Sequence, residues 1–342
     1  MTLTDKGTWL LDRIGGHFLE PSARIGLLAI AVSFLIGAFA YRYYYGRDNF
    51  SVRAYLRHAF PRRVYWSRTF AVDVQIMVLD RLFLPMVWFA RVLSTIAVAG
   101  MLAAGLTAML GPMPVREGSA LTYLVLATLL LLAMDFGTYV THRLSHQVPL
   151  LWAFHRVHHS AEELNPLTLM RKHPVYNVLG VLVDCITVAP LQGVIVYLFG
   201  VPGELQLLAM ANMGFIAFSF IASNLRHTHI WLSYGPVLDK VLVSPALHQI
   251  HHSRAEKHFD TNYGEVLAIW DWLFGTHYQP REREDLEFGI GDEAVQPHPT
   301  LAAAMLEPFV YAWRTIRPHT STNEDERPAD QFEPDAQSRA HP

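Results

Sequence analysis

Apolar runs long enough to cross a membrane restrict this chain more than any other feature of its sequence. Three of them lie in the N-terminal half, at residues 23–45, 82–110 and 119–141. A helix of about 20 apolar residues spans the hydrocarbon core of a bilayer. A single segment crosses it only as a helix, because its backbone groups must then bond to one another. The sequence therefore predicts three membrane-spanning helices here.

Two further apolar stretches, 176–200 and 203–223, are separated by the turn-rich connection FGVPGE. So short a connection predicts a helical hairpin, which either crosses the membrane fully or enters and returns on one side. Only 17% of the residues are charged, whereas soluble domains contain about a quarter. We predict an all-α integral-membrane bundle, with about three spans plus this hairpin, capped by a helical histidine-rich domain outside the membrane.

Composition divides the chain into three parts. Residues 1–118 form a membrane anchor region, residues 119–290 form a central domain with the clustered histidines, and residues 291–342 form a C-terminal tail. From about residue 318 the tail is polar, carries prolines and has almost no large apolar groups. Such a composition predicts disorder in this last segment.

Arginines between the first two runs set the orientation. The segment 42–68 contains seven of them, and loops rich in Lys and Arg stay in the cytoplasm. Counting spans from there brings residue 142, and the chain from residue 224 onward, to the same cytoplasmic side. We predict a bacterial inner-membrane protein with all its histidine clusters on the cytoplasmic face.

Charge and cysteine content exclude several classes of protein. The formal net charge is −3, which gives no basic excess for binding nucleic acid. The single cysteine, Cys185, excludes a disulfide framework and a thiolate-rich metal site; we expect it to be a buried small apolar residue. No G-x-G-x-x-G nucleotide fingerprint occurs, so any redox chemistry needs an external electron donor.

Ten of the eighteen histidines lie in four motifs: HRLSH, HRVHHS, NLRHTH and HQIHHS. Spacings of three and four residues place side chains on one face of a helix. A lone histidine is usually an ordinary core or surface residue, but repeated clusters on one membrane face indicate a metal site. The clustered histidines are His142, His146, His155, His158, His159, His227, His229, His248, His251 and His252.

The type and number of the ligands limit which metal ions fit the site. Neutral imidazole suits zinc, copper, iron and nickel, whereas a structural zinc site takes four ligands and usually some thiolate. Eight to ten histidines are too many for one ion, and two ions with four or five imidazoles each fit the count. The Glu-x-x-His pairs of carboxylate-bridged di-iron bundles are absent from the motifs. We predict two iron ions with open positions for dioxygen.

The order of motifs carries a family resemblance. HRLSH, then HRVHHS with ELNPLTLMRKHP behind it, NLRHTH, HQIHHS and TNYGEVLAIWDWLFGT cover about residues 120–280. This stretch resembles the fatty acid hydroxylase/sterol desaturase superfamily of integral-membrane di-iron enzymes, and residues 119–290 would be its catalytic domain. The resemblance implies that the metal ligands are His142, His146, His155, His158, His159, His227, His248, His251 and His252, with no catalytic residue beyond them.

Family members use dioxygen and external electrons, so the resemblance implies a lipid substrate from the bilayer and a ferredoxin or b-type cytochrome as donor. We predict hydroxylation of a lipid C–H bond, in a sterol, a fatty acyl chain or a related lipid. Lipid or sterol desaturation and ether cleavage by an alkylglycerol monooxygenase remain alternatives, since HHSAEELNPLT resembles that branch. A histidine-lined metal-binding or transport protein is a further alternative, which predicts polar groups along several spans.

Several other residues are candidates for supporting roles. His229 and His173 are each either a metal ligand or an outer partner of one. Asp135 lies two helical turns before His142, and we expect it to accept a hydrogen bond from a ligand histidine, or else to contact a neighbouring helix. For Asp184 the same two alternatives apply. We expect Asn165 and Arg171 to be surface residues unless they brace the loop, and His258 to be a loop residue.

Overall fold

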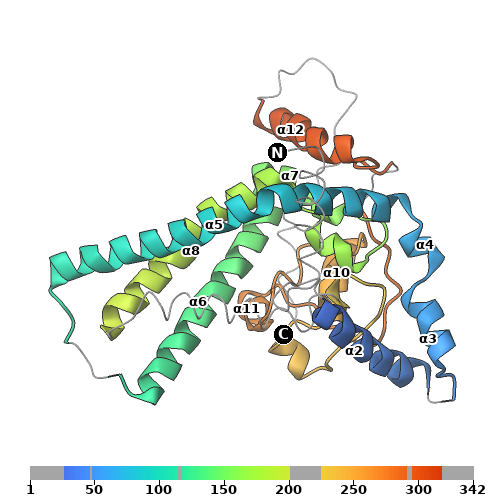
Figure 1. The fold of residues 1–342 in the computed structure, drawn as a ribbon, viewed down its shortest axis with the longest axis horizontal. Helices are drawn as coiled ribbons and strands as arrows, with labels where there is room; N and C mark the ends of the chain where they lie inside the picture. The colour runs from blue at the N-terminus through green and yellow to red at the C-terminus, as the bar shows by residue number, and fades with distance from the viewer. Residues whose placement is uncertain (1–26, 47, 115–117, 201–224, 291–294, 318–342) are drawn as a thin grey trace, which may run out of the picture.

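The computed structural model describes residues 27–46, 48–114, 118–200, 225–290 and 295–317 (Figure 1). Across these ranges the chain is helical, and its β-structure consists of two isolated bridges, Leu242 with Leu267 and Ser253 with Phe288. The predicted all-α architecture is therefore confirmed. The division into three domains is tested by nothing in this arrangement and stays a prediction.

Three long helices form one arm of the molecule: α5 (Arg68–Leu110), α6 (Ala120–Gln147) and α8 (Pro174–Phe199). They share an apolar core of Ala99, Leu126, Leu130, Ala189 and Val196. A Cβ atom on Gly193 would lie 2.7 Å from the carbonyl oxygen of Ala99, so this glycine lets α8 approach the backbone of α5. Of the described helices, α6 and α8 are long and apolar enough to cross a membrane.

Helices lie at the predicted spans, with different ends, and the number of spans stays a prediction. Run 23–45 falls on α2 (Leu27–Tyr45), and run 82–110 is the later part of α5. Run 119–141 lies in α6, which continues for two turns and carries His142 and His146. Run 176–200 corresponds to α8, whereas run 203–223 lies outside the described residues, so the hairpin stays a prediction.

One detail of α8 corrects an expectation. Cys185 is partly exposed and lies between Leu182 and Ile186, which are exposed on the same helix. The prediction of a buried cysteine is therefore wrong. Its apolar neighbours in the sequence cover the outside of the helix instead of a core.

Shorter helices gather at one end of α6 and α8 (Figure 1). Each of α7 (Pro149–His159), α8 and α10 (Pro245–His251) begins with a proline, whose missing N–H and fixed φ suit the first helical turn. Ser244 and Thr300 cap α10 and α12 (Leu301–Ile316) through their hydroxyl groups. The remaining elements are α3 (Val52–Ala59), α4 (Arg62–Tyr65), η1 (Pro166–Met170), η2 (Leu238–Lys240), η3 (Glu256–His258) and α11 (Ile269–Phe274).

Candidate metal centre

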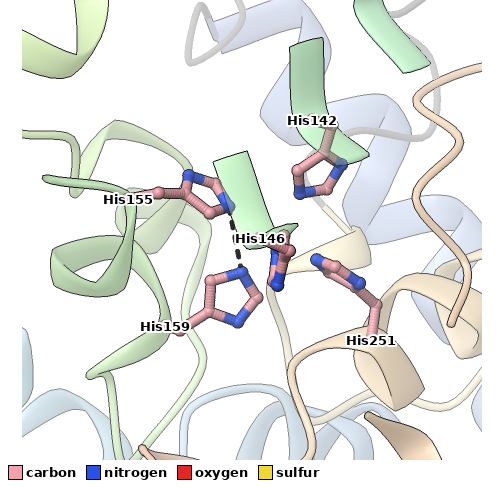
Figure 2. Close-up of side chains that lie close together, drawn as sticks. All are labelled: His142, His146, His155, His159 and His251. Carbon is pink, nitrogen blue, oxygen red and sulfur yellow. Dashed lines mark hydrogen bonds between the residues drawn. The ribbon is translucent and has the colours of Figure 1, made fainter. Parts of the chain in front are cut away.

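Nine buried histidines form two adjoining groups at this end of the helices. In each group the ligand-capable nitrogens lie within 4.8 Å of one another. Figure 2 shows the imidazole rings of the larger group turned toward one another. The five-histidine group consists of His142, His146, His155, His159 and His251, and the four-histidine group consists of His158, His227, His248 and His252.

The two HxxHH motifs serve both groups because successive helical residues are rotated by about 100°. On α7, His155 and His159 are four residues apart and face nearly the same way, into the five-histidine group. His158 is rotated away from His159 and enters the four-histidine group. The motif on α10 divides in the opposite sense, giving two histidines to the four-histidine group and one to the other. Each HxxHH motif therefore contributes histidines to both groups, which keeps the two groups next to each other.

Backbone carbonyls fix the tautomers of two histidines in the five-histidine group. Nδ1 of His142 lies 2.8 Å from the carbonyl oxygen of Tyr263, and Nδ1 of His251 lies 2.8 Å from that of Thr261. A carbonyl only accepts hydrogen bonds, so each Nδ1 donates its proton and each Nε2 keeps a lone pair. Metal-binding histidines are oriented in the same way by a partner at the second ring nitrogen.

Two Nε2 atoms of the five-histidine group have no hydrogen-bond partner. Nε2 of His146 and Nε2 of His251 are both buried without one. Buried polar atoms are nearly always bonded, so each exception requires an explanation. Both atoms belong to the group whose ligand nitrogens converge, and a bound metal ion would satisfy them.

In the four-histidine group the Nε2 atoms converge. Nε2 of His227 lies 3.2 Å from Nε2 of His158 and 3.0 Å from Nε2 of His248, which lies 3.2 Å from Nε2 of His252. A set of imidazoles without thiolate or carboxylate suits a borderline transition-metal ion. Both groups therefore fit the metal that the family implies, and the ligand assignments themselves stay a prediction.

The electrostatics of the pocket favour the ligand form of histidine. Burial, and then the neighbouring imidazoles, lower the pKa of His158 well below its usual value, because a charged ring without solvent is costly. The pKa values of His155, His159, His248, His251 and His252 are lowered for the same reason. Each of these six rings is therefore neutral at pH 7 and presents a lone pair.

Two buried aspartates hold the loop that supplies the Tyr263 carbonyl. Asp271 accepts hydrogen bonds from the backbone N–H groups of Tyr263 and Gly264, at 2.8 and 2.7 Å. Asp135 accepts from the N–H groups of Val266 and Leu267, and from the indole of Trp270 at 2.8 Å. The expected bond from a ligand histidine to Asp135 is therefore replaced by bonds to this loop, a pairing that only the folded chain reveals.

A second network braces the end of α7. Arg171 is fully buried, and its Nη1 lies 2.8 Å from the carboxylate of Asp73 on α5. Its other nitrogens donate to the carbonyl of Val157 and the hydroxyl of Ser160, which adjoin the histidines of α7. Asn165 also donates to Asp73, at 2.6 Å. Asn165 and Arg171 therefore brace the loop behind α7, which was one of the two alternatives. The other alternative, a surface position, is wrong, because Asp73 provides a buried partner 92 residues or more away.

The other candidates lie outside both groups. His173 caps α8 by accepting from Val175, and its Nε2 contacts the carbonyl of Met305. His229 contacts the carbonyl of His58 through Nε2, while His258 is buried beside Glu284. Asp184 accepts a hydrogen bond from Thr141 at 3.3 Å and so joins α8 to α6.

Comparison with known proteins agrees with this geometry. Residues 127–276, which include all nine grouped histidines, match the family described as fatty acid hydroxylase. This part of the chain is similar to the fatty acid hydroxylase family. The resemblance predicted from the motifs is confirmed, and curated relatives of the chain include lipid hydroxylases, desaturases and monooxygenases.

Three relatives show this range. The chain is 32% identical over 179 residues to the ornithine lipid hydroxylase OlsE of Rhizobium tropici, covering 52% of this chain and 49% of the relative. It is 33% identical to human alkylglycerol monooxygenase, and the alignment covers 46% of this chain and 32% of the relative. It is 26% identical to the Delta(7)-sterol 5(6)-desaturase of Eremothecium gossypii, and this alignment covers 45% of this chain and 38% of the relative. The aligned part is thus half or less of each relative, and no solved structure matches the chain.

Proposed function

We propose that this chain is a membrane-bound di-iron oxygenase that hydroxylates a C–H bond of a lipid. One iron would be held by His142, His146, His155, His159 and His251, and the other by His158, His227, His248 and His252. Bound iron supplies the redox chemistry that activates dioxygen, which zinc in the same cage could not do. The observation that carries the proposal is the pair of buried imidazole groups with converging ligand nitrogens, together with Nε2 of His146 and Nε2 of His251, which have no hydrogen-bond partner.

The protein's own part is to hold the rings and shape the space around them. The ring of Trp152 on α7 lies 5.0 Å from that of His146 and 5.6 Å from that of His159. The ring of Tyr176, at the start of α8, lies 4.8 Å from that of His155. Aromatic faces give an apolar chain a surface to pack on. An apolar substrate that enters between α6, α7 and α8 would therefore meet the five-histidine group.

The proposed location is supported by the apolar helices and by the distribution of arginines. The apolar helices α6 and α8 and the membrane enzymes among the relatives indicate a membrane protein. The arginine-rich segment 42–68 supports placing the histidine groups on the cytoplasmic face of a bacterial inner membrane. Reduced ferredoxin or a b-type cytochrome would then reach the site from the cytoplasm.

Desaturation and alkylglycerol ether cleavage are the alternatives, since relatives with both activities match the chain at similar coverage. A metal transporter is less well supported. The grouped histidines lie at one end of α6 and in the helices and the turn beyond it, whereas a transporter requires ligands along its path.

Isotope labelling tests the proposal. Membranes containing the wild-type chain, with reduced ferredoxin and ¹⁸O₂, should yield lipids carrying one ¹⁸O atom in a new hydroxyl group. His158→Ala should abolish this product, while His277→Ala, which changes a histidine outside both groups, should keep it. A new double bond without ¹⁸O would indicate desaturation, and a cleaved glyceryl ether would indicate the monooxygenase alternative. Oxygen-independent metal uptake would contradict the proposal.

A further inference from the structure

The outer face of α12 is apolar although it is exposed. The large side chains on it are between 49% and 65% exposed, and they recur with helical spacing. A contiguous apolar surface of this kind on a folded protein marks a contact with a membrane or another molecule. The residues of this outer stripe are Leu306, Phe309, Val310, Trp313 and Ile316.

The inner face of α12 already has its partners. Ala304, Pro308 and Ala312 are buried, and Ala312 packs with Ala153 and Phe154 of α7. Glu307 forms an ion pair with Arg156 on α7 at 2.9 Å. The helix is therefore apolar on two sides, and the packing of the described residues accounts for only one of them.

The stripe lies beside the start of α8. The carbonyl of Met305 contacts His173, the cap of α8, and the ring of Phe309 lies 5.4 Å from that of His173. The exposed side of α8 then continues through apolar side chains at Val178, Leu182 and Ile186. If α8 crosses the membrane, its first turns lie at the lipid–water boundary, and α12 lies next to them.

The charges of α12 fit the same boundary. Two exposed arginines, Arg314 and Arg317, occupy the C-terminal end of the helix, and the guanidinium of Arg317 lies 4.7 Å above the ring of Trp313. Interfacial helices combine an apolar face with aromatic and basic residues at headgroup depth. Anionic phospholipid headgroups are the partner that complements both features.

We propose that α12 is an interfacial helix whose outer stripe enters the lipid–water boundary of the membrane beside α8. Contact with lipid is thereby linked to α7, because the opposite face of α12 binds the helix that carries three of the grouped histidines. The inference rests on α8 crossing the membrane, and it does not depend on iron or on oxygenase activity.

Spin labelling of the full chain tests it. Cys185→Ala removes the only cysteine, and a nitroxide is then attached at Val310→Cys, Ile186→Cys or Glu282→Cys. Vesicles of phosphatidylcholine and phosphatidylglycerol are probed by collisions with oxygen, which concentrates in lipid, and with a water-soluble nickel chelate. The oxygen-to-nickel collision ratio at 310 should lie several-fold above that at the exposed polar position 282, and below that at 186, which lies near the middle of α8.

Each other outcome overturns the inference. A ratio at 310 equal to that at 282 would mean that the stripe faces water. Shielding from both reagents, with spin–spin broadening, would mean that a second copy covers it, and shielding without broadening would mean that other protein covers it. If the label at 186 is itself in water, α8 does not cross the membrane.

A second variant, Arg314→Glu/Arg317→Glu, should lower the oxygen-to-nickel collision ratio at 310 in anionic vesicles.

Discussion

Two buried polar clusters adjoin the same end of α7, and their hydrogen bonding differs. In the Arg171 network each guanidinium nitrogen has an acceptor, and both oxygens of Asp73 have donors. In the histidine groups, ring nitrogens such as Nε2 of His146 and His251 are buried without a partner. Both clusters are almost free of solvent contact, so burial alone does not distinguish them.

This difference in hydrogen bonding indicates that the Arg171 network is a structural support and that the histidine groups are a binding site. A saturated network contributes rigidity and has no capacity left for a ligand, whereas buried lone pairs without partners are costly until something binds them. The Arg171 network fixes the carbonyl and hydroxyl groups beside His158 and His159, and the histidines keep their lone pairs for metal. The same comparison predicts opposite responses to mutation and to metal removal.

The largest expected effect is on activity in the five-histidine group. His251→Ala removes a ring whose Nε2 has no protein partner, so the fold should persist while oxygenase turnover is lost. Oxygen-dependent product formation and thermal unfolding are to be measured together. Retained turnover would remove His251 from the set of ligands.

The next effect is on stability in the Arg171 network. Arg171→Met leaves Asp73 buried without its ion-pair partner, which costs about 3–5 kcal/mol. The unfolding temperature should fall strongly, and the double variant Asp73→Leu/Arg171→Met should recover much of the loss. A single variant as stable as the wild type would show that the pair is not a support.

Metal removal should separate the clusters. Chelation leaves the histidine groups without a ligand, so the unfolding temperature of the wild type should fall, since ligands that bind the folded state stabilise it. His251→Ala should respond less to the chelator, because less metal is bound to begin with. If the chelator lowers the unfolding temperature of the wild type and of His251→Ala equally, the partnerless Nε2 of His251 does not bind metal.

The smallest effect concerns the loop behind His142. Asp271→Asn weakens the bonds to Tyr263 and Gly264, and with them the carbonyl that orients His142. Outer partners of this type alter metal affinity by about 10–100-fold, and an aspartate-to-asparagine change should lie at the low end. A metal titration of the metal-free protein measures it, with Glu282→Gln as the control. Unchanged affinity would mean that the loop does not orient the ligand.

Sequence periodicity and motif spacing predicted the long helices and the histidine clusters, but not the short helices such as α3, α4 and α12. The apolar runs indicated α2, α5, α6 and α8, and the HxxHH spacing placed histidines on shared helical faces. The assignment of each histidine to one of two groups depends on how α6, α7 and α10 pack, which the spacing does not contain. The buried partners were missed for a similar reason, since Asp73 and Arg171 are 98 residues apart.

Asp73 nevertheless left a signal in the sequence. It is an aspartate among the apolar residues of FAVDVQIMVL, a position where a charge needs a partner. Asp135 left the same signal, and its partners proved to be backbone N–H groups of a loop. An isolated carboxylate in an apolar run thus predicts that a partner exists, and only the tertiary structure identifies it.

The most direct test of the account is the metal content of the purified full chain, expressed with iron and extracted in mild detergent. Elemental analysis should find close to two irons per chain. His251→Ala and His158→Ala should each lose iron, and His277→Ala should keep both ions. One iron or none in a correctly folded wild-type protein, or two irons in both ligand variants, would contradict the assignment of one ion to each histidine group.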